Sequence, residues 1–156
     1  MYRENDFVVY KKDVCKIREI KKIHDKEYYM MFPIDDDTLK ISVPIDNAFI
    51  KPIISKEEAN ALIEKIPFIK TLDMDEKNLE NDYKKLLQKN NLESLITIIK
   101  TTYLRNEKRV HLKKKISEKD ESYFEKAENR LYNELSISLG MSYDETKKHI
   151  IQIFEK

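Results

Sequence analysis

The stretch Pro52-Ile53-Ile54-Ser55-Lys56-Glu57-Glu58 divides the sequence into two parts with different patterns. Before it, short runs rich in Val, Ile, Tyr and Phe are separated by Asp clusters and prolines, which is typical of short strands. After it, apolar residues recur at helical spacing almost to the end, and the only glycine is Gly140. We therefore predict an α+β protein, with a β module over residues 1–54 and a helical domain over residues 55–156.

Alternation of apolar and polar residues identifies one strand of the β module clearly. The run Leu39-Lys40-Ile41-Ser42-Val43 predicts a half-buried strand that Pro44 ends. The acidic turn Asp35-Asp36-Asp37 precedes it, so residues 28–43 are expected to form a hairpin. Further strands are expected over residues 7–10 and 14–20. This density of short strands favours a small, strongly curved sheet or an SH3-like (Tudor-like) barrel.

The helical domain contains start and stop signals for several helices. Ser55 with Glu58, and Ser142 with Glu145, form capping boxes that begin the first and the last helix. Pro67 ends the first helix. The helices between them are expected from near Asp73 or Asp75 to about Lys89, from Leu92 to at least Tyr103, and from Ser117 to a left-handed cap at Gly140.

Positive charge is concentrated in one part of the chain. The formal net charge is only +1. From Lys84 to Lys115, however, ten Lys or Arg residues stand against Glu93 and Glu107, a local balance of +8. The stretch Arg105–Lys115 either extends the third helix or forms a basic loop, and the pattern does not decide between them.

Several function classes lack their sequence signals. A chain with one glycine has no glycine-rich phosphate loop, and its three histidines are scattered without metal-ligand spacing. Cys15 is the only cysteine, so no intramolecular disulfide is possible. No signal region or run of about eighteen apolar residues is present. We expect a cytoplasmic protein that is not an enzyme and that uses no metal or cofactor.

The order of the motifs resembles the CarD/CdnL-type transcription regulators, whose N-terminal module also occurs in transcription-repair coupling factors. Asn5-Asp6-Phe7-Val8-Val9-Tyr10 resembles the opening strand of that family. Glu27-Tyr28-Tyr29 and the run from Leu39 to Pro44 resemble two of its later strands. In the helical half the resemblance rests on Asp82-Tyr83-Lys84, on Leu104-Arg105-Asn106-Glu107-Lys108, and on the pattern from Ser117 through Phe124, Ala127 and Leu131 to Leu135.

Three departures from the family pattern concern its binding residues. The tryptophan that many members insert into the DNA minor groove is absent, and Leu79 falls at its position. Ser42 stands where a strand residue that often meets polymerase is Arg. The link from Arg105 to Ser117 is longer and more basic than in the family.

The resemblance implies a monomeric bacterial transcription regulator that binds the RNA polymerase β subunit through the β module. It further implies contact of the helical domain with promoter DNA, which stabilises the open complex. The polymerase-binding residues would be Tyr10, Lys40 and Ser42. The DNA-binding residues would be Leu79, Lys84, Lys85, Arg105, Arg109, Lys113, Lys114 and Lys115. The alternative is an interaction module that binds polymerase or another partner without a DNA role.

Overall fold

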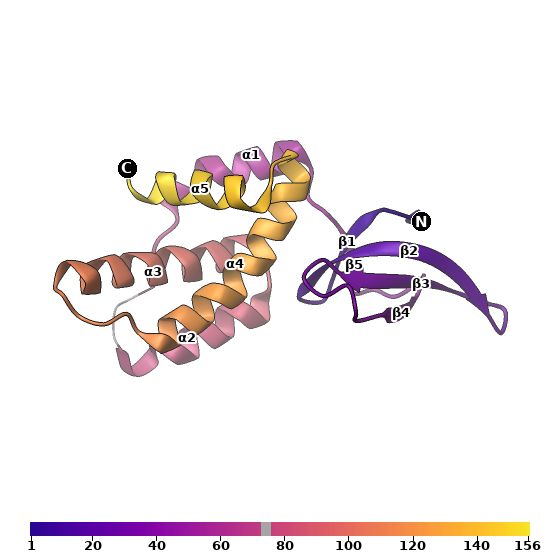
Figure 1. The fold of residues 1–156 in the computed structure, drawn as a ribbon, viewed down its shortest axis with the longest axis horizontal. Coiled ribbons are helices and arrows are strands. Elements are labelled where there is room, and N and C mark those ends of the chain that lie inside the picture. The colour runs from indigo at the N-terminus through magenta and orange to yellow at the C-terminus, as the bar shows by residue number, and fades with distance from the viewer. Residues whose placement is uncertain (73–75) are drawn as a thin grey trace. The chain divides into compact units, whose positions relative to one another are not determined.

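The computed structural model describes residues 1–72 and 76–156, and these divide into two compact units, Met1–Ile54 and Ser55–Lys156. The first unit is a sheet and the second is helical, which confirms the predicted α+β class (Figure 1). None of the described helices combines the length and the apolar character that a membrane crossing requires.

The β module is one antiparallel sheet of five strands in the order β4-β3-β2-β1-β5. The strands are β1 (Phe7–Tyr10), β2 (Asp13–Ile23), β3 (Lys26–Pro33), β4 (Ile41–Pro44) and β5 (Ile50–Pro52). Its core is built on one face by buried side chains from all five strands: Val8, Cys15, Ile17, Tyr29, Met31, Val43 and Ile50.

The loop between the two edge strands shows that this sheet is strongly curved. In a flat sheet β4 and β5 would lie four strand spacings apart, about 19 Å. The loop from Pro44 to Ile50 could span about 20 Å only if fully extended. It instead turns back on itself, because the Asn47 N–H donates to the Pro44 carbonyl at 3.0 Å and the Ile50 N–H to the Asn47 carbonyl at 3.4 Å. The two edges therefore approach each other at this end, as the predicted curvature requires.

One prediction for the β module is wrong. The alternating pattern places Leu39 in the strand with Ile41 and Val43, yet it lies outside β4 and is 51 % exposed. The Leu39 N–H donates to the Asp36 carbonyl at 3.3 Å, so Leu39 belongs to the turn before the strand. Alternation alone could not show where the turn ends and the strand begins.

The helical unit packs around α3 and α4, whose facing sides supply most of its core. Both predicted capping boxes are present, and α4 ends at Gly140 with φ of +68°, as predicted. The expected start of the second helix near Asp73 or Asp75 lies outside the described residues. The elements are α1 (Lys56–Lys65), the 3₁₀ turn η1 (Ile66–Phe68), α2 (Glu76–Lys89), α3 (Leu92–His111), α4 (Glu118–Leu139) and α5 (Tyr143–Phe154).

Candidate functional site

Strand β4 is an edge of the sheet, and the ladder shows which of its main-chain groups face outward. Its only neighbour in the strand order is β3. The Ile45 N–H donates to the Glu27 carbonyl at 3.2 Å, and Ser42 lies opposite Met30 in the same register. Hydrogen-bonded and non-hydrogen-bonded pairs alternate along an antiparallel ladder. The Ile45–Glu27 pair is hydrogen-bonded, so the Ser42–Met30 pair, three residues away, is not. The N–H and C=O of Ser42 therefore point away from β3.

The row of main-chain N–H and C=O groups that face outward from β4 is short. Ser42 is its donor within the strand, because Pro44, the next outward residue, has no N–H. Lys40 lies just before the strand, and both Lys40 and Ser42 are exposed. This edge can pair with a short incoming strand, and a longer one would meet the proline.

Tyr10 occupies a different place from Lys40 and Ser42. It ends β1, which lies between β2 and β5, so its main chain is not at an edge. Its ring is half-buried against the sheet core. The Nζ atom of Lys11 lies 5.3 Å from the Tyr10 ring centroid and 5.9 Å from that of Phe49. The structure therefore places Tyr10 beside the β4–β5 loop rather than on the β4 ladder.

The end of α3 and the link that follows form a surface that we call the basic tip, residues 108–115. The helix continues through His111, so the Arg105–Lys115 stretch is partly helix and partly link. Lys113 has φ of +58°, its N–H donates to the Val110 carbonyl, and the Lys114 N–H donates to the Arg109 carbonyl at 2.7 Å. This is a Schellman end, which fixes the backbone of the tip.

The basic tip exposes both charged and apolar side chains. Lys113, Lys114 and Lys115 are exposed. Between the cations, Val110 and Leu112 are 56 % and 52 % exposed. A polyanion would meet closely spaced cations on a fixed turn, which suits phosphate contacts without sequence selectivity.

Arg105 has a structural partner in the helical unit. Its Nε donates to Asp120 Oδ2 at 2.8 Å, with 11 % of the Arg105 side chain and 3 % of the Asp120 side chain exposed. The Tyr83 hydroxyl donates to the other Asp120 oxygen at 3.1 Å. Burial and the nearby Asp120 carboxylate raise the pKa of Tyr83 well above its usual value. This network joins α2, α3 and α4, so we assign Arg105 to the fold.

A polar pocket of about 200 Å³ lies beside this network in the helical unit. Two of its three lining cations pair with carboxylates: Lys119 Nζ lies 3.0 Å from Glu80 Oε2, and Arg105 pairs with Asp120. The balance of charge in the pocket therefore does not favour a particular small ligand. It is lined by Leu79, Glu80, Tyr83, Arg105, Arg109, Ser117, Lys119 and Asp120.

Leu79 is only 4 % exposed, which contradicts its expected role as an apolar wedge. A side chain that inserts between base pairs must project from the surface, and Leu79 instead packs within the helical unit. Lys84 and Lys85 on the same helix are exposed. Lys84 Nζ lies 3.8 Å from Glu80 Oε1, in a surface pair of small energetic value.

Sequence reasoning missed two exposed aromatic side chains. Phe49 is 62 % exposed in the β4–β5 loop, and Phe68 is 84 % exposed in η1. Neither stands in a periodic pattern, and both would be read as loop residues. Within the described residues, no three His, Cys, Asp or Glu side chains are grouped to share a metal ion.

Comparison with known proteins identifies the first unit. Residues 2–56 match the family model of the CarD-like/TRCF RID domain, which spans the whole β module and the first two residues of the helical unit. No curated protein matches the chain significantly. The module that matches is a polymerase-interacting one, and the edge strand and its exposed loop belong to it. Over residues 2–56, therefore, the β module of this chain is a CarD-like/TRCF RID domain.

Proposed function

We propose that this protein binds the β subunit of RNA polymerase through the β4 edge and contacts promoter DNA through the basic tip, which stabilises the open complex. The observation that carries the proposal is the outward N–H and C=O of Ser42 in a module of the RID family. An edge strand of this kind gains affinity from main-chain hydrogen bonds to an added strand.

The DNA part of the proposal rests on the basic tip. Lys113, Lys114 and Lys115 are exposed on a turn whose backbone is fixed by the Schellman end. Arg109 on the last turn of α3, and Lys84 and Lys85 on α2, add to the positive charge of the same unit. Each phosphate neutralised releases counterions, so binding through the tip weakens steeply with salt.

The polymerase contact is tested by removing one N–H without altering the ladder inside the module. The Ser42→Pro variant loses the outward donor, and an edge position with its N–H toward solvent tolerates proline. Ser42→Ala is the matched control, because it keeps the N–H. We expect Ser42→Pro to weaken binding to an isolated β-lobe fragment by about tenfold, since the hydrogen bond is removed and the ring crowds the added strand. Equal binding by both variants, with unchanged circular dichroism, contradicts docking at this edge.

The DNA contact is tested by reversing charge at the tip. In the variant with Lys113, Lys114 and Lys115 changed to Glu, we expect a shorter lifetime of the polymerase–promoter complex at low salt. The slope of log affinity against log salt should also fall by roughly three, about one for each phosphate that the tip no longer neutralises. A control variant with Lys56, Lys70 and Lys148 changed to Glu carries the same charge change on exposed sites elsewhere in the helical unit.

A second candidate function is an interaction module that binds polymerase without touching DNA. The burial of Leu79 and the Arg105–Asp120 pair favour it, because two of the eight expected DNA-binding residues serve the fold. If the tip variant and its control give the same complex lifetime at every salt concentration, this second function replaces the first.

A further inference from the structure

We propose that Phe49 is the side-chain anchor of the polymerase-docking surface, and that it inserts into an apolar pocket of the β lobe beside the strand that pairs with β4. The inference rests on the proposed function, since it takes the β lobe as the partner. The β4 ladder alone offers few hydrogen bonds, so a side-chain contact is needed to give the surface its affinity and selectivity.

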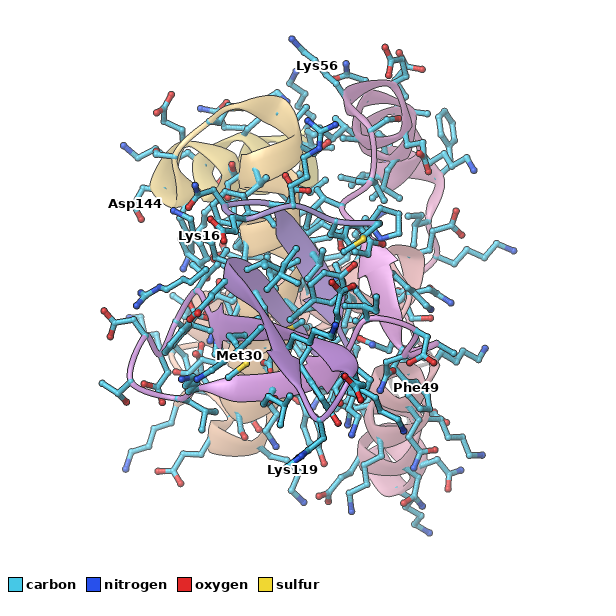
Figure 2. All side chains as sticks on the ribbon, turned by 90° about the vertical axis from the view of Figure 1, so that its right-hand side faces the viewer. Lys16, Met30, Phe49, Lys56, Lys119 and Asp144 are labelled. Carbon is cyan, nitrogen blue, oxygen red and sulfur yellow. The ribbon has the colours of Figure 1, made fainter. Side chains whose placement is uncertain are left out.

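Exposure of the Phe49 ring is the first observation. With 62 % of the residue exposed, most of an aromatic side chain lies in water. Burial of such a ring in an apolar site is favourable, and aromatic residues are enriched among those that dominate binding energy. Figure 2 labels Phe49 in the sticks view of the side chains, at the margin of the β module.

The backbone that carries Phe49 is held in place. The Asn47 side chain accepts the Phe49 N–H at 2.8 Å, and the Asn47 main chain makes two further bonds, to Pro44 and Ile50. The loop is therefore tied to the end of β4 and the start of β5. A ring on a fixed turn loses little conformational entropy on binding, which is the advantage of a preorganised anchor.

Continuity with the β4 edge is the third observation. Phe49 follows Pro44, the last residue of β4, by five residues in a loop that turns back on itself. Because the sheet is curved, its two edge strands, β4 and β5, approach each other at this loop. A strand added to β4 therefore has one end directed toward the Phe49 ring. Tyr10 lies opposite Ile50 in the β1–β5 register, and Lys11 contacts both rings.

These contacts define the chemistry of the complementary site. Lys11 places a cation above the Tyr10 and Phe49 rings, at 5.3 and 5.9 Å from their centroids. An apolar pocket with a carboxylate at its rim would complement the ring and the positive charge beside it. The same arrangement explains why Tyr10 serves the surface although its main chain is not at an edge.

The experiment compares two exposed phenylalanines. Affinity for an isolated β-lobe fragment is measured by calorimetry for the full chain and for Phe49→Ala, Phe68→Ala and Phe49→Tyr. We expect Phe49→Ala to bind at least about tenfold more weakly, Phe68→Ala to bind as the parent does, and Phe49→Tyr to retain most of the affinity. Circular dichroism and thermal unfolding of each variant confirm that the β module is folded.

The Ser42→Pro variant separates this inference from the proposed function. If Ser42→Pro weakens binding and Phe49→Ala does not, the edge docks without the anchor and the inference is overturned. Should Phe49→Ala and Phe68→Ala weaken binding equally, general surface hydrophobicity is responsible and the inference is again overturned. If neither Ser42→Pro nor Phe49→Ala has an effect, the proposed docking surface itself is wrong.

Discussion

The two units of this protein differ in whether charged side chains are buried. In the β module the buried side chains are apolar, and the Lys and Asp residues lie on its surface. Every buried charged side chain among the described residues belongs to the helical unit: Asp120, Glu128 and Glu134, which pair with Arg105, Lys147 and Arg130. In the helical unit, therefore, buried carboxylates are paired with cations, and the Arg105–Asp120 pair joins α3 to α4.

This difference determines how far charge can be used to locate a binding site. In the β module an exposed cation such as Lys40 lies on the surface. The docking group that we propose there is main chain, which any sequence supplies. In the helical unit a cation in the sequence can already be committed to a buried carboxylate, as Arg105 is. Four predictions test the contrast, beginning with the largest effect.

Removal of the Asp120 carboxylate breaks the buried network. In Asp120→Ala the Arg105 guanidinium and the Tyr83 hydroxyl lose their shared acceptor, and an uncompensated buried charge remains. We expect the helical unit to lose about 3–5 kcal/mol of stability. Urea unfolding followed by circular dichroism measures it. The control is Glu118→Ala, which removes an exposed acid from the same first turn of α4. It should lose less than about 1 kcal/mol of stability. Equal losses in the two variants would show that Asp120 acts only through the helix dipole.

The same change at two buried tyrosines should have opposite effects in the two units. Tyr29 in the β module is 1 % exposed and its hydroxyl accepts the Tyr2 N–H at 3.0 Å. Tyr132 in α4 is 0 % exposed, and its hydroxyl has no hydrogen-bond partner within the described part of the chain. We expect Tyr29→Phe to lose about 1 kcal/mol and Tyr132→Phe to be neutral or to gain about 1 kcal/mol in thermal unfolding. Destabilisation by Tyr132→Phe would indicate a bound water on that hydroxyl.

Two helix ends with the same hydrogen-bond pattern allow a smaller comparison inside the helical unit. Gly140 and Lys113 both have positive φ, +68° and +58°, at Schellman ends. No atom lies within 4 Å of a Cβ built on Gly140, so only backbone strain opposes a side chain there. We expect Gly140→Ala to lose about 1 kcal/mol and Lys113→Gly to gain slightly less. Chemical denaturation checks both, and a loss of stability in Lys113→Gly would show that the lysine side chain holds the tip.

The sequence predicts the elements of this fold better than its binding residues. The capping boxes at Ser55 and Ser142 and the cap at Gly140 are local signals, because the groups that they join lie within a few residues of each other. The partner of Arg105, by contrast, is fifteen residues away on another helix, and the burial of Leu79 depends on packing between helices. Phe49 gives no periodic signal, because its exposure depends on the loop between β4 and β5, whose path follows from the curvature of the folded sheet.

The last and smallest effect concerns Glu128, whose Oε2 lies 3.1 Å from Lys147 Nζ. Burial raises the pKa of this carboxyl above its usual value despite the lysine, and Glu121 and Glu125 act in the same direction. A raised pKa in the folded state means that the folded protein binds this proton more tightly than the unfolded chain does. The stability that Glu128 contributes is therefore fully present below its unfolded pKa, and it is lost as the pH rises through the folded value.

In Glu128→Gln this pH-dependent contribution disappears. At about pH 7 we expect the variant to equal the parent in stability or to exceed it by less than about 1 kcal/mol. This stability advantage of the variant should shrink as the pH falls toward about 4. Thermal unfolding of both proteins across this pH range gives the difference, and Glu125→Gln, an exposed position on the same helix, is the control. An advantage of the parent that grows toward neutral pH would mean that the Lys147 contact outweighs burial, and Glu128 would then join Asp120 as a carboxylate that stabilises the helical unit by its charge.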